Sequence, residues 1–164
     1  MGIPYDEAPD GHVRLDPTFG PRDFVVVCVG GNDFALRDTV VPEDILKAVK
    51  EIIKIYKRKG VSPNRMVYVT PSPPTPKMLE RAEKQETGDL NALYRQFVDG
   101  AKEMCTEEGI DCVPLDHFTY KERSDTAFIP TPTPHGAKVL AGLIRKCILD
   151  AIEKEHEDIR VTIV

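Results

Sequence analysis

The 164-residue sequence has no apolar run that approaches the roughly 20 residues of a membrane-spanning helix. Its first residues, 1–6, also lack the basic segment and the following apolar segment of a signal peptide. We therefore expect no membrane contact and a cytoplasmic location. Excess positive charge is missing too, because the formal net charge is −5. This balance disfavours nucleic acid and anionic lipid as partners.

The sequence also lacks recognisable metal and redox motifs. No C-x-x-C pair occurs among its four cysteines, which are Cys28, Cys105, Cys112 and Cys147. All four lie within apolar patterns, where a thiol behaves as a small hydrophobic group. We therefore predict buried, reduced cysteines, and we expect neither a metal ion nor another cofactor.

What the sequence does contain is a strand that ends in a polar turn. Residues 25–29 are apolar and mostly β-branched, a pattern typical of a parallel strand that is buried on both faces. Gly30 and Gly31 end this strand, and Asn32 and Asp33 follow. Open α/β sheets bind ligands at the carboxyl ends of their strands. The sequence therefore predicts an active-site layout here, with no helix opening directly after it.

Hydrophobic periodicity predicts alternating strands and helices over the rest of the chain. The expected strands are 24–29, 66–70, 110–114 and 159–164, and the expected helices are 42–60, 87–108 and 133–152. Pro42 and Pro134 occupy favoured first positions of helices, Thr133 is a good N-cap, and Gly109 is a typical helix stop. This alternation predicts an α/β fold with a mostly parallel sheet.

The expected organisation is one domain with short flanking segments. Residues 1–22 are rich in Pro, Gly and Asp and predict an irregular lead-in, in which 12–15 is a short strand. The domain itself is expected to span 23–155. Residues 156–164 then form a C-terminal strand or tail.

Two short motifs resemble those of the SGNH (GDSL-type) hydrolases, a family of esterases, lipases and acetylhydrolases. The Gly-Gly-Asn-Asp block at 30–33 resembles the family's Gly-x-Asn-Asp, and the Thr-Pro-His-Gly segment at 133–136 resembles its Thr-Pro-x-Gly. The resemblance covers roughly 23–155. It implies a flavodoxin-like, three-layer α/β/α sandwich that lacks the family's first strands. It also implies an ancestry in ester hydrolysis, with Gly30 and Asn32 in the oxyanion hole and a small ester or acyl group as ligand.

The family's nucleophile and base are not evident in this chain. Serine occurs at 62, 72 and 124, and none of these follows Gly-Asp. An ungapped alignment on 133–136 places Thr131 at the catalytic histidine and Phe128 at the aspartate, and neither can do that chemistry. A gapped register makes Asp125 the acid, but Phe128 then occupies the histidine position. We therefore expect little or no hydrolytic activity.

Three groups remain as candidates for the missing chemistry. His135, in the first turn of the last helix, is either a displaced base or an exposed residue. His117 follows Asp116 after the third central strand and forms a second candidate pair. Ser72 lies between two prolines and is the candidate nucleophile.

Two other functions stay open at this point. One is a non-catalytic binding or interaction module on the same fold. The other is a nucleotide-binding, flavodoxin-like domain, although residues 30–33 match neither G-x-G-x-x-G nor a P-loop. An open edge at strand 25–29 would be an aggregation liability. We therefore expect the segment 159–164, a second copy of the chain or a separate N-terminal segment to pair with it.

Overall fold

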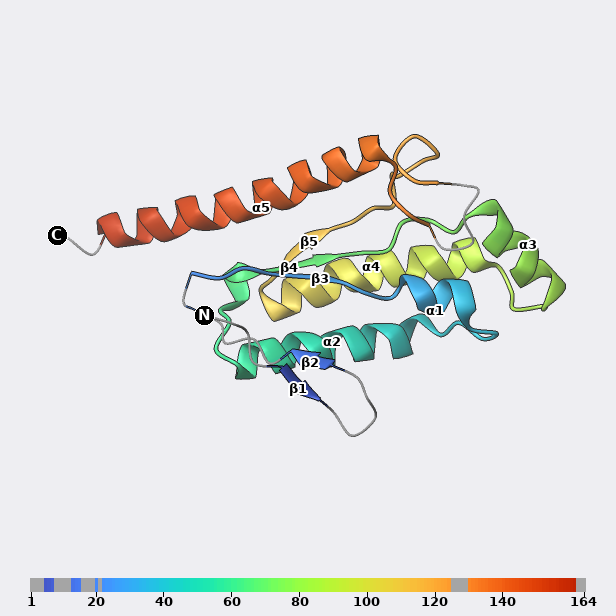
Figure 1. Cartoon of the computed structure of the whole chain (residues 1–164), viewed down its shortest axis with the longest axis horizontal. Coiled ribbons are helices and arrows are strands. Elements are labelled where there is room, and N and C mark those ends of the chain that lie inside the picture. The colour runs from blue at the N-terminus through green and yellow to red at the C-terminus, as the bar shows by residue number, and fades with distance from the viewer. Residues whose placement is uncertain (1–4, 8–12, 16–19, 21, 125–129, 162–164) are drawn as a thin grey trace.

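A small parallel sheet organises the computed structural model, which describes residues 5–7, 13–15, 20, 22–124 and 130–161. Its order is β3-β4-β5, formed by β3 (Val25–Cys28), β4 (Met66–Val69) and β5 (Asp111–Val113) (Figure 1). In the sheet, Val67 of β4 pairs with Val26 on one side and with Asp111 on the other. A separate antiparallel pair joins β1 (Tyr5–Glu7) to β2 (Val13–Leu15) within the expected lead-in. The expected α/β class is confirmed in this general form.

Helices cover the sheet on opposite sides. They are α1 (Gly31–Leu36), α2 (Pro42–Arg58), α3 (Pro76–Lys84), α4 (Leu90–Glu108) and α5 (Pro134–Val161), with a short 3₁₀ helix η1 (Pro63–Arg65). In Figure 1, α2 and α4 lie on one side of the sheet and α5 lies on the other. The three predicted helices are confirmed as α2, α4 and the first part of α5. Neither α1 nor α3 was predicted.

Local signals explain the bounds of α4. The Asp89 side chain accepts hydrogen bonds from the backbone N–H groups of Asn91 and Ala92, at 3.0 and 3.1 Å. The helix therefore begins at Leu90 and not at residue 87. It ends where expected, at Gly109, which adopts a left-handed conformation with φ 68°.

The core has two parts, one on each face of the sheet. The larger part lies between the sheet and helices α2 and α4, and its most deeply buried side chains include Ile53, Met66, Tyr68 and Phe97. The smaller part lies beneath α5 and contains Val67, Val69, Val113, Leu115 and Phe118, packed against Val139, Leu140, Leu143, Ile144 and Cys147. Alternate residues of β4 therefore face different helices. All four residues of β4 are buried.

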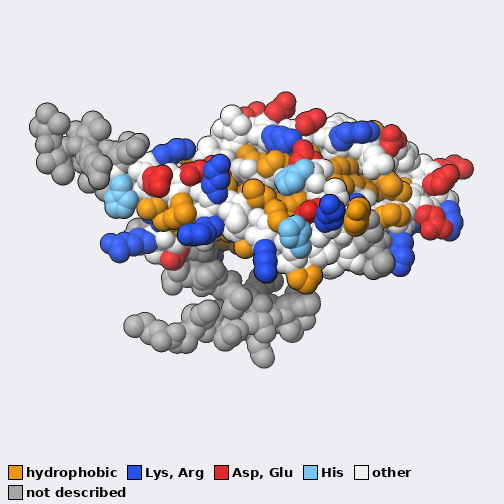
Figure 2. Space-filling model, turned by 90° about the horizontal axis from the view of Figure 1, so that it is seen from above, with side chains coloured by type: hydrophobic (Ala, Val, Ile, Leu, Met, Phe, Trp, Pro, Cys, Tyr) orange, Lys and Arg blue, Asp and Glu red, His pale blue; other side chains and the backbone are white. Residues whose placement is uncertain are grey.

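The expectation that strand 25–29 is buried on both faces is wrong. Val26 is 38% exposed and Cys28 is also exposed, whereas Val25 and Val27 are buried. Val26 and Cys28 pair in register with Val67 and Val69, so they lie on the face that α5 covers farther along the sheet. Seen from the α5 side, this face of the molecule carries hydrophobic side chains between charged ones (Figure 2). On this face the helix covers β4 and β5 but leaves Val26 and Cys28 of β3 exposed.

The exposure of Cys28 also corrects the expectation that every cysteine is buried. Cys105 is buried, and Cys112 and Cys147 are half-buried. All four are free thiols, as expected.

The predicted C-terminal strand is not formed over residues 159–161, because α5 continues to Val161. No glycine or proline interrupts the sequence from 143 to 161, and each further helical residue adds a backbone hydrogen bond to a helix already nucleated. Glu155 anchors this part of α5, accepting bonds from Arg65 Nε at 2.9 Å and Asn64 Nδ2 at 3.0 Å. The tail therefore does not cover β3 through these residues, and 162–164 lie outside the described residues. Pairing with a second copy or a separate segment stays a prediction.

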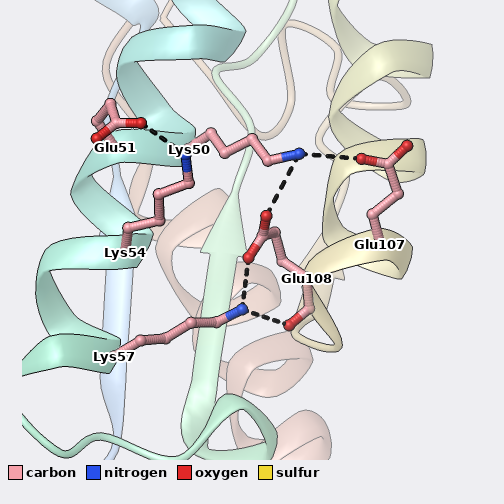
Figure 3. Close-up of polar contacts among 6 residues, drawn as sticks. All are labelled: Lys50, Glu51, Lys54, Lys57, Glu107 and Glu108. Carbon is pink, nitrogen blue, oxygen red and sulfur yellow. Dashed lines mark hydrogen bonds and ion pairs between the residues drawn. The ribbon is translucent and has the colours of Figure 1, made fainter.

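An ion-pair network joins the neighbouring helices α2 and α4 (Figure 3). Lys50 Nζ lies 3.1 Å from Glu107 Oε2 and 3.3 Å from Glu108 Oε1. Lys57 Nζ donates to the Glu108 carboxylate and, at 2.8 Å, to its backbone carbonyl. Hydrogen bonding to Lys57 and Lys50 lowers the pKa of Glu108 below its ordinary value. The network holds the end of α4 against α2.

Candidate functional site

A pocket of about 180 Å³ lies at the carboxyl edge of the sheet. We call it the sheet-edge pocket. Its described lining comes from the ends of all three strands, from α5 and from the preceding loop: Cys28, Val29, Gly31, Val69, Thr70, Pro71, Ser72, Leu115, Phe118, Arg123, Pro130, Pro132 and Leu140. Ligands of parallel α/β sheets bind at this edge. The location agrees with the site expected from the sequence.

The lining is mainly apolar, with three polar side chains. The Thr70 hydroxyl is buried and already makes two hydrogen bonds. It accepts one from Leu115 N at 2.9 Å and donates one to Pro71 O at 3.2 Å. Ser72 is half-buried in the proline-rich segment, and Arg123 contributes a positive charge. Among the described lining residues there is neither a histidine nor a carboxylate.

A turn at Gly30 joins β3 to α1 beside this pocket. Gly30 has a φ of +104°, and a Cβ there would lie 3.4 Å from both Ile45 and Phe97, so only glycine fits without strain. The Tyr68 hydroxyl donates to Val29 O at 2.9 Å and so fixes the residue that precedes the turn. Burial raises the pKa of Tyr68 far above its ordinary value, so this donor stays protonated. The turn presents Gly31 to the pocket.

The two expected oxyanion residues lie in and after this turn. Gly30 is the N-cap residue of α1, and Asn32 is exposed in the first turn of that helix. Asn32 is not among the described lining residues, whereas its neighbour Gly31 is. Asp33 forms an ion pair with Arg37, Oδ1 to Nε, at 2.7 Å. The structure therefore brings the Gly30 turn to the pocket but leaves the Asn32 side chain at the surface.

The prediction that no helix opens directly after this block is wrong, because α1 begins at Gly31. Glycine, asparagine and aspartate are poor helix formers, and a six-residue helix is too short to show a periodic pattern. Helix α1 instead forms because Phe34 and Ala35 are buried in the core. Phe34 packs edge-on against Tyr94 and Phe97, with ring centroids 5.8 and 5.3 Å apart.

The expected acid and base are not assembled at the pocket by the described residues. The His135 side chain is 64% exposed, and its Nε2 lies 3.6 Å from Glu122 Oε1. His135 is therefore a surface residue of the first turn of α5. Thr131 is exposed as well. Asp125 and Phe128 lie outside the described residues.

The second candidate pair lines a different, more open groove. His117 Nδ1 lies 3.6 Å from Asp116 Oδ1, and Asp116 Oδ2 accepts a bond from Lys102 Nζ at 3.0 Å. The hydrogen bond from Lys102 is the main cause that lowers the pKa of Asp116. Tyr94 lines this groove and donates to Pro71 O, at 3.0 Å, on the wall of the sheet-edge pocket. His117 and Ser72 thus face two adjacent hollows.

Arg123 is the site residue that the sequence did not predict. Its backbone is held by an isolated antiparallel bridge to Pro132 and by its own N–H, which donates to Thr119 O at 2.9 Å. The flanking Glu122 O accepts from Thr133 N at 2.8 Å. These contacts bring a side chain that is only 9% exposed to the pocket wall. The irregular stretch 116–132 carries no sequence pattern that could have located it.

The described structure thus defines a mixed α/β protein with a small parallel sheet and an apolar pocket at its carboxyl edge. No model of a known protein family matches the sequence, and a search of curated proteins finds no match either. Over the described residues, every helix falls short of the length or apolar character that crossing a membrane requires. No group of His, Cys, Asp and Glu suited to a metal ion occurs among those residues.

Proposed function

We propose that this chain is an SGNH-hydrolase-like domain that binds a small ester or acyl group in the sheet-edge pocket without hydrolysing it. The proposal includes a three-layer, flavodoxin-like α/β/α arrangement as its fold. The observation that carries it is an apolar pocket at the carboxyl ends of the strands, directly beside the Gly30 turn. This is the layout that the Gly-Gly-Asn-Asp block suggested.

The size and lining of the pocket support a short acyl ligand. An apolar protein cavity of about 150 Å³ holds a benzene molecule. A pocket of about 180 Å³ therefore has room for a ligand of similar size. Leu115, Phe118 and Leu140 supply apolar surface for its hydrocarbon part.

The polar groups of the pocket do not support ester hydrolysis. Acyl transfer by a serine needs a base within hydrogen-bond reach of its hydroxyl. Ser72 lines the pocket, but the described lining supplies no histidine or carboxylate. His135 is instead exposed beside Glu122. Incubation with p-nitrophenyl acetate and a serine-reactive fluorophosphonate should therefore give no turnover and no label.

Binding is tested by titrating ethyl acetate into the ¹⁵N-labelled protein and following backbone amide resonances. We expect saturable shifts at Gly31 and Val69, which line the pocket. Leu140→Trp fills the pocket and should abolish these shifts. Leu149→Trp is the matched control, since Leu149 lies on the same helix and is 43% exposed. Binding that persists in the Leu140 variant would contradict the proposed site.

One result would restore the enzyme hypothesis. Covalent fluorophosphonate labelling at Ser72, abolished by His135→Ala, would show that the two residues act together in solution. The non-catalytic proposal would then be wrong, whereas the pocket would stand.

A further inference from the structure

The sheet-edge pocket combines an apolar wall with a buried positive charge. Arg123 is only 9% exposed, yet it belongs to the pocket lining. Charged side chains are rarely buried to this extent in a soluble protein. A guanidinium at the wall of a small hollow is a site of strong electrostatic influence, because the surrounding protein screens it less than water does.

We propose that the sheet-edge pocket recognises a short-chain carboxylate, whose carboxyl group pairs with Arg123 and whose hydrocarbon chain lies against Leu115, Phe118 and Leu140. This inference rests on the proposed function, since it names the ligand class of the same pocket. It goes beyond that function in assigning a charged ligand and the residue that selects it.

The backbone around Arg123 supports a recognition role, because it fixes where the side chain begins. Arg123 is bridged to Pro132, and Ser124 N donates to Thr131 O at 2.8 Å on the same pair of segments. The start of α5 adds a further bond, from Thr133 N to Glu122 O at 2.8 Å. A side chain that starts from a fixed backbone loses less freedom when it binds a ligand.

The positive charge of Arg123 also acts on Tyr94, whose hydroxyl contacts the pocket wall. Burial raises the pKa of Tyr94, and the positive charge of Arg123 opposes part of that rise. The Tyr94 hydroxyl itself donates to Pro71 O. Pro71 lines the sheet-edge pocket together with Arg123, so Tyr94 adjoins the same wall.

Carboxylate chemistry fits this arrangement better than other anions do. The guanidinium has a planar set of donors that matches the two oxygens of a carboxylate. Phosphate offers no hydrocarbon part for the apolar wall. Butyrate is close in size to benzene, which a cavity of about 150 Å³ holds, so it suits a pocket of about 180 Å³.

The test compares butyrate with ethyl acetate, which is a neutral isomer of butyric acid, and with inorganic phosphate. Affinities are measured at about pH 7 from the amide shifts of Gly31 and Val69. We expect wild-type protein to bind butyrate about tenfold more tightly than ethyl acetate, because a charge-assisted pair is added. Phosphate should bind much more weakly than butyrate.

Variants then assign the difference to Arg123. Arg123→Gln should weaken butyrate binding about tenfold and change ethyl acetate binding by less than about twofold. Arg123→Lys should keep part of the preference, since it retains the charge but loses the planar pair of donors. Arg145→Gln is the control, because Arg145 is exposed on α5 and outside the described lining. An amide spectrum of each variant confirms that it is folded.

Failures of the two proposals are distinguishable. If ethyl acetate binds but butyrate binds no more tightly, the carboxylate inference is wrong and the acyl-binding function stands. If neither binds, the proposed function is wrong. Phosphate binding as tight as that of butyrate would overturn the ligand class. The wild-type comparison decides the inference even if the Gln variant does not fold.

Discussion

Replacement of Gly136 by alanine tests the close approach of α5 to the backbone of Glu122. Glycine to alanine within a helix normally stabilises a protein, by up to about 1 kcal/mol. Gly136 lies in the first turn of α5 and is buried against the backbone of Glu122. A Cβ at this position would come within 2.8 Å of Glu122 Cα and 2.5 Å of its carbonyl carbon, and closer still to the carbonyl oxygen. Backbone atoms must therefore move.

The structure allows the size of this effect to be estimated. Moving Glu122 away from α5 strains the bond from Thr133 N to Glu122 O, which is 2.8 Å long, and the bond from Gly136 N to Thr133 Oγ1, which is 3.0 Å long. Overpacking of this kind costs about 1–3 kcal/mol, and each weakened hydrogen bond costs about 1 kcal/mol. These costs exceed the gain in helix propensity. We expect Gly136→Ala to lower the free energy of unfolding by about 2–4 kcal/mol.

A matched control lies in the same helix. No heavy atom lies within 4 Å of a Cβ built on Gly142, which is exposed. Gly142→Ala should therefore raise the free energy of unfolding by about 0.5–1 kcal/mol. Urea denaturation followed by circular dichroism measures both changes. Equal stabilities for the two variants would refute the close approach of α5 to Glu122. A destabilised Gly136 variant that remains folded should also bind butyrate more weakly, because Glu122 precedes Arg123.

Three further perturbations have defined outcomes. Tyr68→Phe removes the donor to Val29 O and should lower the free energy of unfolding by about 1 kcal/mol; an unchanged urea midpoint would contradict this. The pKa of Glu108 is below its ordinary value of 4.5, so its ion pairs stabilise the fold above that pH and are lost as the pH falls through the lowered value. Glu108→Gln should therefore cost about 0.5 kcal/mol in urea unfolding at neutral pH and almost nothing in strong acid; a difference that persists in acid would oppose this. Partial burial raises the pKa of the Cys28 thiol. Its alkylation by iodoacetamide, followed by mass spectrometry, should therefore be slower than that of a free cysteine at neutral pH, and slower again with ligand in the pocket. Reaction at the rate of free cysteine would contradict this prediction.

Much of the fold was predictable because strong local patterns agree with the packing. Helix α4 carries a long apolar face, which is buried against the sheet, and a glycine stop at Gly109, which adopts a left-handed conformation. The central strand β4 reads as continuously apolar and is buried along its whole length. β3 has the same residue types but lies at the edge of the described sheet. The residue types of a strand do not show whether the helix over one of its faces, here α5, reaches far enough to cover it.

Helix α3 was missed although its start signal was present. Thr75 followed by Pro76 has the same form as Thr133 followed by Pro134, from which the last helix was predicted. In the structure, Thr75 Oγ1 accepts a bond from Met78 N at 3.3 Å and caps α3. The sequence predictions used this signal at Thr133 but not at Thr75.

The alternation at the C-terminus shows the limit of a period-two pattern. Ile159 and Val161 flank Arg160 as they would in a strand, yet 159–161 are helical. A pattern this short fits either structure, and the preceding residues decide between them. Here a long helix without glycine or proline reaches this segment and continues through it.

The candidate site likewise has one part that the sequence predicts and one part that it does not. Its apolar wall comes from strand ends, whose positions in a parallel sheet follow from the order of the elements. Its charge comes from Arg123, whose position depends on pairing between 119–124 and 131–133 and on the fit of Gly136 against Glu122. No local pattern encodes such pairing, because it is made between loop segments. The Gly136 substitution therefore matters for function as well as stability: a 2–4 kcal/mol strain at that contact would displace the loop that carries the selecting charge, while the strand ends and their apolar wall stay in place.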